Sequence, residues 1–325
     1  MSEDEFAVVP EAHGLSGMIA CISDQAGRPG LMILDVSSGS STALMSVDCS
    51  WRSVPAVAPG GDRVALQGAD GRLKVVSVVT DQTESIGEPI PGLVTPSWSP
   101  GGDAIMYELD ATVHVVSLSG TLSKSDFAAA NAAWMGDGSK TVFVADGALH
   151  AKDTWTGQTV KLTAGPDKIW GLAASRDGVH AAYVASDDDE ALLRVVDVFT
   201  GETWEMRTSR GIWPWSLAWS PNGGSLAYCV GGPEARGGQR VSVWMLDARA
   251  IGADDGCEPN AIVTFVSDPR CAGLAWSPDS KAVATAARTG ESGLYSVYAV
   301  DSAGGAHQLT SRGNCVLPDW GPSPI

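Results

Sequence analysis

The stretch Leu217-Ala218-Trp219-Ser220-Pro221-Asn222-Gly223-Gly224-Ser225-Leu226-Ala227-Tyr228 is one copy of a motif that recurs along the chain. It contains a short apolar segment that ends in Trp-Ser-Pro, then a tight turn of Asn and Gly, then a second apolar segment. Self-similarity at a fixed period of about 20 to 50 residues is the signature of proteins built from repeated structural units. The motif therefore decides the fold of this chain.

Related segments occur before and after residues 217–228. Each has a turn of Gly, Asp or Asn that is followed by an apolar run, and two of the copies are degenerate. The copies begin with Val57-Ala58-Pro59-Gly60-Gly61-Asp62, Trp98-Ser99-Pro100-Gly101-Gly102-Asp103, Trp134-Met135-Gly136-Asp137-Gly138, Ala174-Ser175-Arg176-Asp177-Gly178 and Trp276-Ser277-Pro278-Asp279-Ser280. A last fragment, Asp319-Trp320-Gly321-Pro322, lies near the end of the chain.

Each second apolar segment is followed by a third segment with alternating apolar residues and usually by a weaker fourth one. Residues 73–78, 113–118 and 241–246 are examples of the third segment. They are short, rich in β-branched residues and bounded by Gly, Asp or Ser, which is typical of β-strands. Four strands in a repeat of roughly 45 residues predict the blade of a β-propeller.

The two ends of the sequence predict the number of blades. Residues 315–320 supply a first strand, whereas residues 17–22, 30–36 and 41–44 are later strands with no first strand before them. Joining the two ends completes one blade and removes two sheet edges that would otherwise pair with other chains. The sequence therefore predicts an all-β fold, a seven-bladed β-propeller of four-stranded blades, in which the C-terminal first strand joins the N-terminal strands and closes the ring. Residues 1–14 are expected to be an N-terminal tail and residues 15–325 a single propeller.

The turn Trp-Ser-Pro-Asp/Asn-Gly before an apolar strand resembles the repeat of the TolB-type propellers. This repeat also occurs in the propeller domains of prolyl-oligopeptidase-like proteins and is similar to WD-repeat blades. The resemblance extends from about Gly17 to Pro322. This sequence departs from TolB in the number of blades. TolB resembles a six-bladed ring behind an export signal and another domain, whereas seven blades are expected here. The sequence also departs from the oligopeptidases, because it contains no Gly-x-Ser-x-Gly elbow of a hydrolase domain.

Composition and charge limit the classes of partner. The apolar fraction of 44 % is that of a globular protein. The net charge of −17 argues against nucleic acid, whose phosphates need a positive surface, and against docking to anionic lipid. No run approaches the length of about 18 apolar residues that spans a membrane, and the N-terminus is acidic where a secretory signal is basic. We expect a cytoplasmic monomer with no nucleic-acid or membrane partner.

The 12 tryptophans are unusually many for a chain of this length. Four of them hold the same repeat position, namely Trp98, Trp134, Trp219 and Trp276. An aromatic ring that fills the wedge between adjacent sheets buries a large apolar area. We therefore interpret these tryptophans as packing residues between blades.

The six cysteines show no metal-ligand spacing and no Cys-x-x-Cys motif. Cys21 and Cys229 lie in apolar second strands, which predicts buried, reduced thiols. Cys271 and Cys315 hold the same place ahead of successive first strands. They could pair if neighbouring blades bring them together, although reduced thiols are favoured in a cytosolic protein.

Candidate binding residues lie in the connectors between blades. The turns between first and second strands are short and uniform, whereas the connectors vary, as functional loops on a rigid scaffold do. The candidate ligand-binding residues precede the repeat proline or its equivalent, at the mouth of the central channel: Trp51, Arg52, Asn131, Lys168, Trp170, Trp213, Trp215, Arg270, Cys271 and Asn314. Trp213 and Trp215 flank a stiff proline, which fits either an aromatic wall that faces a ligand or a hydrophobic plug. Tryptophan and arginine also dominate binding hot spots.

Charged loops between second and third strands are expected around that mouth. They are residues 187–190, which are adjacent acids, residues 231–240, which contain two Gly-Gly pairs, and residues 288–292. Two interpretations stay open, solvated loop tips or, for residues 231–240, a Gly-hinged flap over a pocket. The acids lack the alternate-ligand spacing and the fixed Gly of a calcium loop, so no metal site is predicted.

No complete catalytic set is found in the sequence. The five histidines are scattered, and there is no His-Glu-x-x-His motif. There is no Walker loop and no Gly-x-Gly-x-x-Gly before a helix, so we expect no nucleotide and no other cofactor.

Two functions are compatible with these residues. The first is a binding module that presents the aromatic, Arg- and Lys-containing channel mouth to a small molecule, a peptide or a partner protein. The second is a small-molecule enzyme, a lyase, hydrolase or cyclase, with its active site at the same mouth. There Arg52, Lys168 or Arg270 would hold an anionic group, and an acid such as Asp187 or Glu234 would move protons. The binding module is favoured because it needs no catalytic residues.

Overall fold

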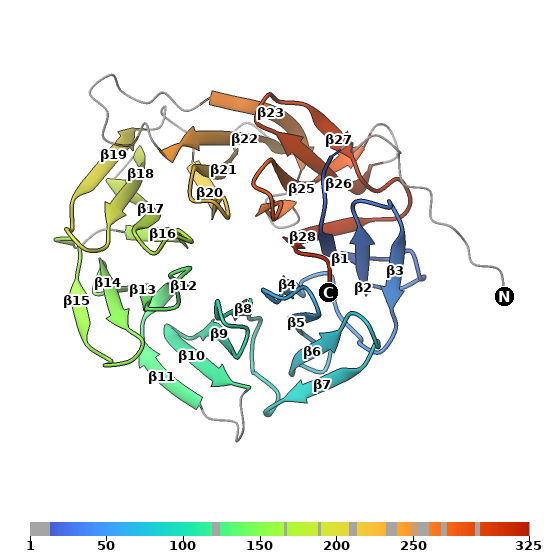
Figure 1. The fold of residues 1–325 in the computed structure, drawn as a ribbon, viewed down its shortest axis with the longest axis horizontal. Helices are drawn as coiled ribbons and strands as arrows, with labels where there is room; N and C mark the ends of the chain where they lie inside the picture. Colours follow the sequence, from blue (N-terminus) through green and yellow to red (C-terminus); the bar gives the residue numbers. More distant parts are fainter. Residues whose placement is uncertain are drawn as a thin grey trace. The chain divides into compact units, whose positions relative to one another are not determined.

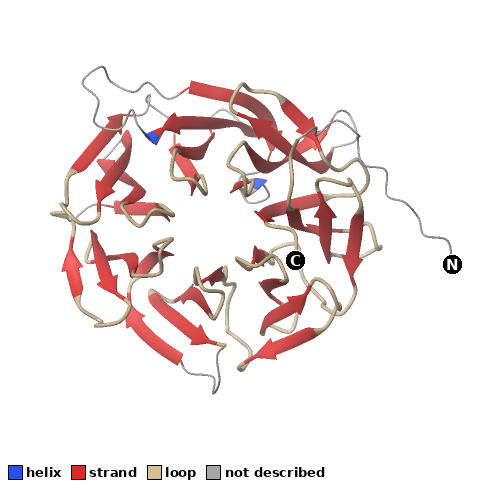
Figure 2. Cartoon of the chain, in the orientation of Figure 1, coloured by secondary structure: helices blue, strands red, loops and turns tan. Residues whose placement is uncertain are grey.

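The structure, a computed structural model, describes residues 14–118, 124–165, 168–187, 190–207, 213–231, 239–248, 251, 260–267, 272–289 and 293–324. In these ranges the chain is almost entirely strand and turn (Figure 2). The strands form seven antiparallel sheets of four strands each (Figure 1). The predicted fold class, an all-β seven-bladed propeller, is confirmed. No helix within these ranges is long and apolar enough to cross a membrane.

Each blade contains four strands that follow one another in the sheet. The first blade contains β28 (Cys315–Gly321), β1 (Met18–Ser23), β2 (Gly30–Asp35) and β3 (Ser41–Leu44). The second contains β4 (Ala56–Val57), β5 (Arg63–Gln67), β6 (Leu73–Ser77) and β7 (Thr83–Ile86). The third contains β8 (Ser97–Trp98), β9 (Ala104–Leu109), β10 (Thr112–Ser117) and β11 (Lys124–Ala128).

The remaining blades repeat this order. The fourth contains β12 (Ala130–Trp134), β13 (Lys140–Ala145), β14 (Ala148–Asp153) and β15 (Thr159–Lys161). The fifth contains β16 (Lys168–Ala174), β17 (His180–Asp187), β18 (Glu190–Asp197) and β19 (Thr203–Arg207). The sixth contains β20 (Trp213–Trp219), β21 (Ser225–Gly231), β22 (Gln239–Asp247) and β23 (Asn260–Ser267). The seventh contains β24 (Ala275–Trp276), β25 (Ala282–Thr289), β26 (Leu294–Asp301) and β27 (Ala306–Gln308).

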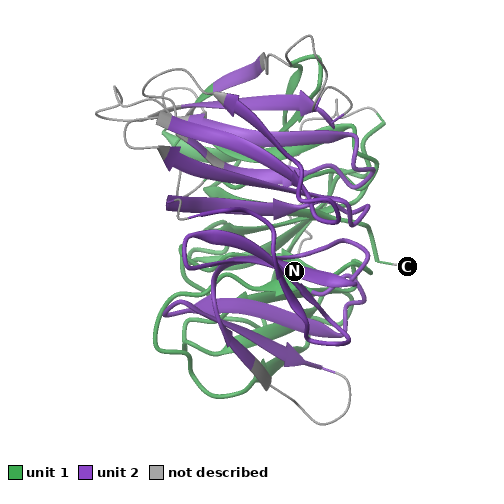
Figure 3. Ribbon diagram, turned by 90° about the vertical axis from the view of Figure 1, so that its left-hand side faces the viewer, with its two compact units in different colours: residues 1–98, 265–325 green, residues 99–264 purple. Residues whose placement is uncertain are grey.

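The chain divides into two compact units, which Figure 3 shows in different colours. The first unit contains Met1–Trp98 and Phe265–Ile325, and the second contains Ser99–Thr264. The first, second and seventh blades lie in the first unit. The fourth and fifth blades lie in the second unit, together with most of the third and sixth.

The first blade is completed by a strand from the other end of the sequence. β28 pairs antiparallel with β1 and places Cys315 opposite Ser23. Near the other end of β28 the indole of Trp320 donates a hydrogen bond to the carbonyl oxygen of Ser16, at 3.0 Å. The closure predicted from the incomplete first repeat is thus confirmed.

The hydrophobic core lies between neighbouring sheets. Of the tryptophans at the shared repeat position, three are buried, namely Trp98, Trp219 and Trp276. The fourth, Trp134, is partly buried. The indole N–H of Trp219 donates to the carbonyl oxygen of Ala173 in the preceding blade, at 3.2 Å. The indole N–H of Trp98 donates in the same way to Ala56, at 2.9 Å. These rings therefore fill the space between two sheets and also tie the sheets together, as predicted for packing residues.

Aspartates hold the turns between third and fourth strands. Asp197 Oδ1 accepts the backbone N–H groups of Phe199 and Thr200, both at 2.8 Å. Asp35 and Asp153 make the same turn in the first and fourth blades. Burial raises the pKa of Asp197, but the hydrogen bonds to its charged form outweigh burial and lower that pKa. The same balance lowers the pKa of Asp35, and hydrogen bonds from its own turn lower the pKa of Asp153.

These turns predict that the protein loses stability in acid. A carboxyl whose pKa is lower in the folded chain than in the unfolded chain stabilises the fold fully above its unfolded pKa of about 3.9. That contribution is lost as the pH falls through the folded pKa. We therefore expect the urea midpoint of unfolding to be nearly constant between pH 7 and pH 5 and to fall between pH 4 and pH 2.5. Asp197→Asn should flatten this decline. A wild-type midpoint that does not change between pH 5 and pH 2.5 would contradict the prediction.

Candidate functional site

Five blades share a backbone irregularity within or just before the first strand. Shortly before the repeat aromatic or its equivalent, one residue has a positive φ: Asn131 (46°), Gly171 (69°), Ser216 (54°), Gly273 (59°) and Leu317 (55°). In β12, β16, β20 and β28 the pairing with the neighbouring strand shifts register at this place. Such a β-bulge bends the strand and turns its side chains in a new direction, and bulges are common next to functional sites.

The second and third blades lack both the positive φ and the register shift, and a proline precedes the first strand of each. β4 and β8 have two residues each, and Pro55 and Pro96 stand directly before them. Proline has no N–H to donate to a neighbouring strand, so it ends the pairing at that point. In these two blades the first strand therefore begins directly after the proline.

In the second unit, the starts of three first strands are linked by hydrogen bonds from side chain to backbone. Asn131 Nδ2 in β12 donates to the carbonyl oxygen of Ile169 in β16, at 3.4 Å. Trp170 Nε1 in β16 donates to the carbonyl oxygen of Pro214 in β20, at 3.2 Å. The strands β12, β16 and β20 thus follow one another side by side (Figure 1). The residues that make these links are candidate residues from the sequence.

Five of the candidate residues belong to this linked set, namely Asn131, Lys168, Trp170, Trp213 and Trp215. Asn131 is the bulge residue of β12, and its backbone N–H is accepted by Glu108 Oε2 at 2.7 Å. Lys168 is exposed at the first position of β16. Trp170 is partly buried against the core of the fifth and sixth blades. For Trp213 and Trp215 the structure describes the backbone, which pairs with Gly231 and Cys229.

The candidate residues of the first unit fall into two groups. Trp51, whose side chain is 38 % exposed, and Arg52, which is exposed, occupy a turn before β4. Asn314 instead uses its whole amide within the protein. Its Nδ2 donates to Asp24 Oδ2 at 2.9 Å, and its Oδ1 accepts the N–H of Tyr295 at 3.0 Å. Arg270 and Cys271 lie outside the described residues.

Sequence reasoning identified the connectors but missed the bulge. The bulge position is occupied by Asn, Gly, Ser, Gly and Leu, so no single residue type marks it. The available signal was weak. Gly171 and Gly273 stand inside apolar first-strand segments, and an isolated glycine in a strand suggests a bulge.

Comparison with known proteins relates this strand arrangement to solved structures. No protein-family model matches the chain, and no curated protein matches its sequence. TolB from Acinetobacter baumannii superimposes with a TM-score of 0.56 at 16 % identity, over 95 % of this chain and 69 % of TolB. The chain has the TolB-like propeller fold. At this identity the likeness concerns the fold alone.

Two further solved structures are similar to this chain. Hydrazine synthase from Kuenenia stuttgartiensis matches with a TM-score of 0.59 at 13 % identity, over 75 % of each chain. The β-propeller domain of Cps50 (Swd1) from Myceliophteria thermophila matches with a TM-score of 0.58 at 14 % identity, over 82 % of this chain and 88 % of that one. Proteins with unrelated functions therefore share this fold, which is why the function has to be argued from the residues of the propeller.

The charged loops of the propeller are only partly described. Asp187 is the last residue of β17 and pairs with Glu190, the first residue of β18. Residues 188–189, 232–238 and 290–292, which include Glu234 and most of the predicted flap, lie outside the described ranges. Among the residues that are described, no group of three or more His, Cys, Asp or Glu is arranged to hold a metal ion.

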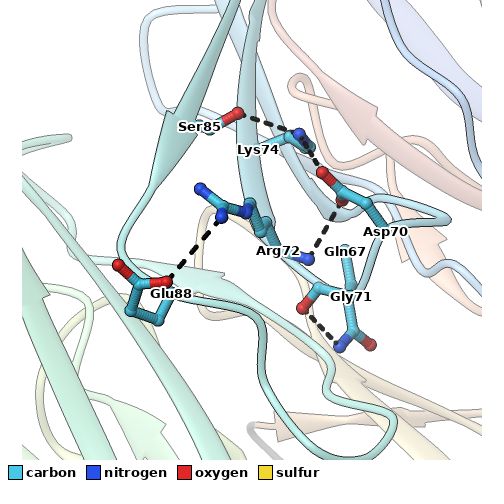
Figure 4. Close-up of polar contacts among 7 residues, drawn as sticks. All are labelled: Gln67, Asp70, Gly71, Arg72, Lys74, Ser85 and Glu88. Atoms are coloured by element: carbon cyan, nitrogen blue, oxygen red, sulfur yellow. Dashed lines mark hydrogen bonds and ion pairs between the residues drawn. The ribbon is translucent and has the colours of Figure 1, made fainter.

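The corresponding loop in the second blade is held by its own polar contacts (Figure 4). Lys74 Nζ lies 2.7 Å from Asp70 Oδ2 and 2.8 Å from Ser85 Oγ. Gln67 Nε2 donates to the carbonyl oxygen of Gly71 at 3.1 Å. The polar side chains of this loop therefore stabilise the loop itself.

A small hollow lies beside β1, β2 and β3. Ser23, Gln25, Arg28, Leu31 and Met45 are among its lining residues. Its volume is about 20 Å³, which is room for a single water molecule. The hollow is thus too small for a metabolite, and sequence reasoning did not single it out.

Four cysteines of the propeller are described, and all four are buried, free thiols: Cys21, Cys49, Cys229 and Cys315. The buried state predicted for Cys21 and Cys229 is confirmed. Burial raises the pKa of the Cys49 thiol to about 11 and that of the Cys229 thiol to about 12. Cys315 is a free thiol, in line with the reduced state favoured over a bond to Cys271, and Cys271 lies outside the described residues.

Proposed function

We propose that this propeller is a binding module and that the starts of β12, β16 and β20 hold a peptide segment or the surface of a partner protein. One observation supports the proposal: three consecutive first strands are joined through Asn131 and Trp170. Each strand start also carries an amide, a cation or an aromatic residue. Large aromatic residues close to polar and cationic groups are typical of binding hot spots.

The residue types suggest what kind of segment would bind. Lys168 is an exposed cation in a chain whose net charge is −17, so it would attract a carboxylate of the ligand. Trp213 and Trp215 lie in the neighbouring strand and would supply apolar contacts. We therefore propose a ligand in which an acidic residue stands next to an apolar one. Trp51 and Arg52 of the first unit offer a second, separate pair of the same kind.

The proposal predicts that Trp215→Ala weakens binding without unfolding the protein. Random peptides displayed on phage are selected on the immobilised chain, and the best one is synthesised and titrated by calorimetry. Loss of a hot-spot residue costs about 2 kcal/mol or more, so the dissociation constant should rise about 30-fold or more. Lys168→Ala should weaken the same peptide and reduce the salt dependence of its binding.

Trp155→Ala is the matched control. Trp155 is also in the second unit and its side chain is 89 % exposed, so its loss should change neither affinity nor thermal stability. If Trp215→Ala lowers the thermal midpoint by several degrees, Trp215 is a packing residue and the proposal is wrong. If the peptides bind the Trp215 and Lys168 variants as well as the wild type, the site lies elsewhere. Selective binding of a metabolite from a control panel in place of any peptide would make the ligand a small molecule.

A further inference from the structure

Two buried thiols meet where β28 joins β1. Cys315 is the first residue of β28 and lies opposite Ser23. Cys21 and Ser23 are alternate residues of β1, so their side chains are on the same face as that of Cys315. The Cys21 and Cys315 side chains are both completely buried in the same hydrophobic cluster, and each thiol shifts the pKa of the other. We propose that Cys21 and Cys315 are a redox-active pair that forms a disulfide and so ties β28 covalently to β1.

The strand geometry favours this pairing. The register of β1 with β28 shifts at Cys21, because Leu317 and Pro318 of β28 stand where one residue would be regular. Leu317 has a φ of 55°, which marks the bulge. Since the two thiols are already neighbours on adjacent strands, a disulfide requires side-chain rotation and a local adjustment, with no change in strand order. Residues far apart in space could not be bridged in this way.

The two thiols have unequal surroundings, which assigns their roles. The interaction with the Cys21 thiol lowers the pKa of the Cys315 thiol, although burial and the charge of Asp24 oppose this. The Cys315 thiol donates a hydrogen bond to Ser23 Oγ at 3.5 Å, and interactions with the Ser23 and Thr310 side chains lower its pKa further. The pKa of Cys21 is raised by the same thiol contact and by burial. Because the thiolate is the nucleophile, Cys315 is the attacking sulfur and Cys21 is the second, resolving thiol.

The Gln25 side chain contacts both the Cys315 sulfur and the hollow beside β1. Gln25 Nε2 lies 3.8 Å from Cys315 Sγ and also hydrogen-bonds the carbonyl oxygen of Arg312. Gln25 and Ser23 both line the small hollow beside β1. Rotation of the Gln25 side chain would therefore open a path from this hollow to the sulfur. Cys229 is equally buried, and the raised pKa of its thiol has burial as its cause.

A small disulfide such as oxidised glutathione can serve as the oxidant that converts the two thiols into a disulfide. The Cys315 thiolate attacks one glutathione sulfur, the glutathione disulfide bond breaks, and one glutathione thiolate leaves and takes up a proton. The Cys21 thiol then loses its proton, its sulfur attacks the Cys315 sulfur of the mixed disulfide, and the second glutathione leaves as a thiol. Two protein thiols are oxidised and one glutathione disulfide is reduced to two thiols.

The test treats the full chain with oxidised glutathione, alkylates the remaining thiols in denaturant and maps the tryptic peptides. We expect the free thiol count to fall by two and a peptide that links Cys21 to residues 313–325, which contain Cys315. Trypsin does not cleave before Pro29, so Cys21 and Cys49 stay in one peptide, and fragmentation or the Cys49→Ser variant locates the bond. The thermal midpoint should rise by about 5 °C or more, because the bond closes a very long loop, and dithiothreitol should reverse the rise.

Single variants separate this pair from other thiol chemistry. Cys21→Ser and Cys315→Ser should each abolish the linked peptide and the thermal shift, whereas Cys229→Ser should keep both. Three results would overturn the proposal: no linked peptide in the wild type, a link from Cys315 to Cys271 in place of Cys21, or a glutathione adduct on Cys315 that never resolves. The wild-type map decides these outcomes even if a variant fails to fold.

Discussion

Trp219→Ala is expected to lower the free energy of unfolding by about 3 to 5 kcal/mol, as large truncations in a core do. The ring of Trp219 is 7 % exposed, stacks on His180 and belongs to the cluster that joins the fifth and sixth blades. Its loss leaves a cavity in that cluster. It also leaves the carbonyl oxygen of Ala173 without its indole donor.

Urea unfolding followed by circular dichroism measures this effect. Circular dichroism is preferable to fluorescence because the substitution removes a fluorophore. The slope of the transition should be compared between variants, since a protein with two compact units can depart from two-state unfolding. Trp155→Ala is the same substitution at an exposed site and should change stability by less than about 0.5 kcal/mol. If both variants lose the same stability, the assignment of the repeat tryptophans to packing is wrong.

Removal of residues 315–325 is expected to have an even larger effect, because it deletes β28. Cys315, Val316 and Trp320 are buried in this strand, and each apolar side chain of this kind contributes about 1.5 to 3 kcal/mol. Asp319 also accepts the backbone N–H of Val57 in the second blade, at 2.6 Å. The truncated chain should therefore lose about 5 kcal/mol or more.

The loss of β28 also leaves β1 as an unpaired edge. Because all six residues of β1 are buried in the intact protein, this edge would be long and apolar, and such edges aggregate. Size-exclusion chromatography should show aggregates, and a thermal scan should show a much lower midpoint. A chain that lacks Pro324 and Ile325 alone keeps β28 and serves as the control. A truncated chain that stays monomeric and melts within about 2 °C of this control would refute the role of β28.

The fold could be predicted from the sequence because its determinants are local and repeated. The turn that follows Trp219 recurs in the other repeats, and each copy predicts the same pair of strands. The incomplete repeats at the two ends of the sequence predicted the pairing of β28 with β1. Boundaries were also close: residues 315–320 were expected as a strand, and β28 is Cys315–Gly321. Propensity and tertiary packing agree in these segments, which is the situation in which sequence reasoning succeeds.

The candidate site was less predictable because it depends on the backbone path and on neighbours from other blades. Asn314 was expected in a binding face, yet its amide is hydrogen-bonded to Asp24 and Tyr295, which are far from it in sequence. The contact of Cys315 with Cys21 depends on a bulge at Leu317, a residue type that rarely adopts a positive φ. Neither the contacts of Asn314 nor that of Cys315 can be recognised from the spacing of residues in the sequence.

The short first strands of the second and third blades have a consequence for the motions of the protein. β4 makes two cross-strand pairs with β5, whereas β16 makes six with β17. Proteins open locally where few backbone hydrogen bonds and contacts hold a segment, at a much smaller free energy than global unfolding. The prolines before β4 and β8 thus mark short strands where we expect transient fraying to begin, as in the equally short β24, while the strand starts proposed to bind a ligand lie in longer strands.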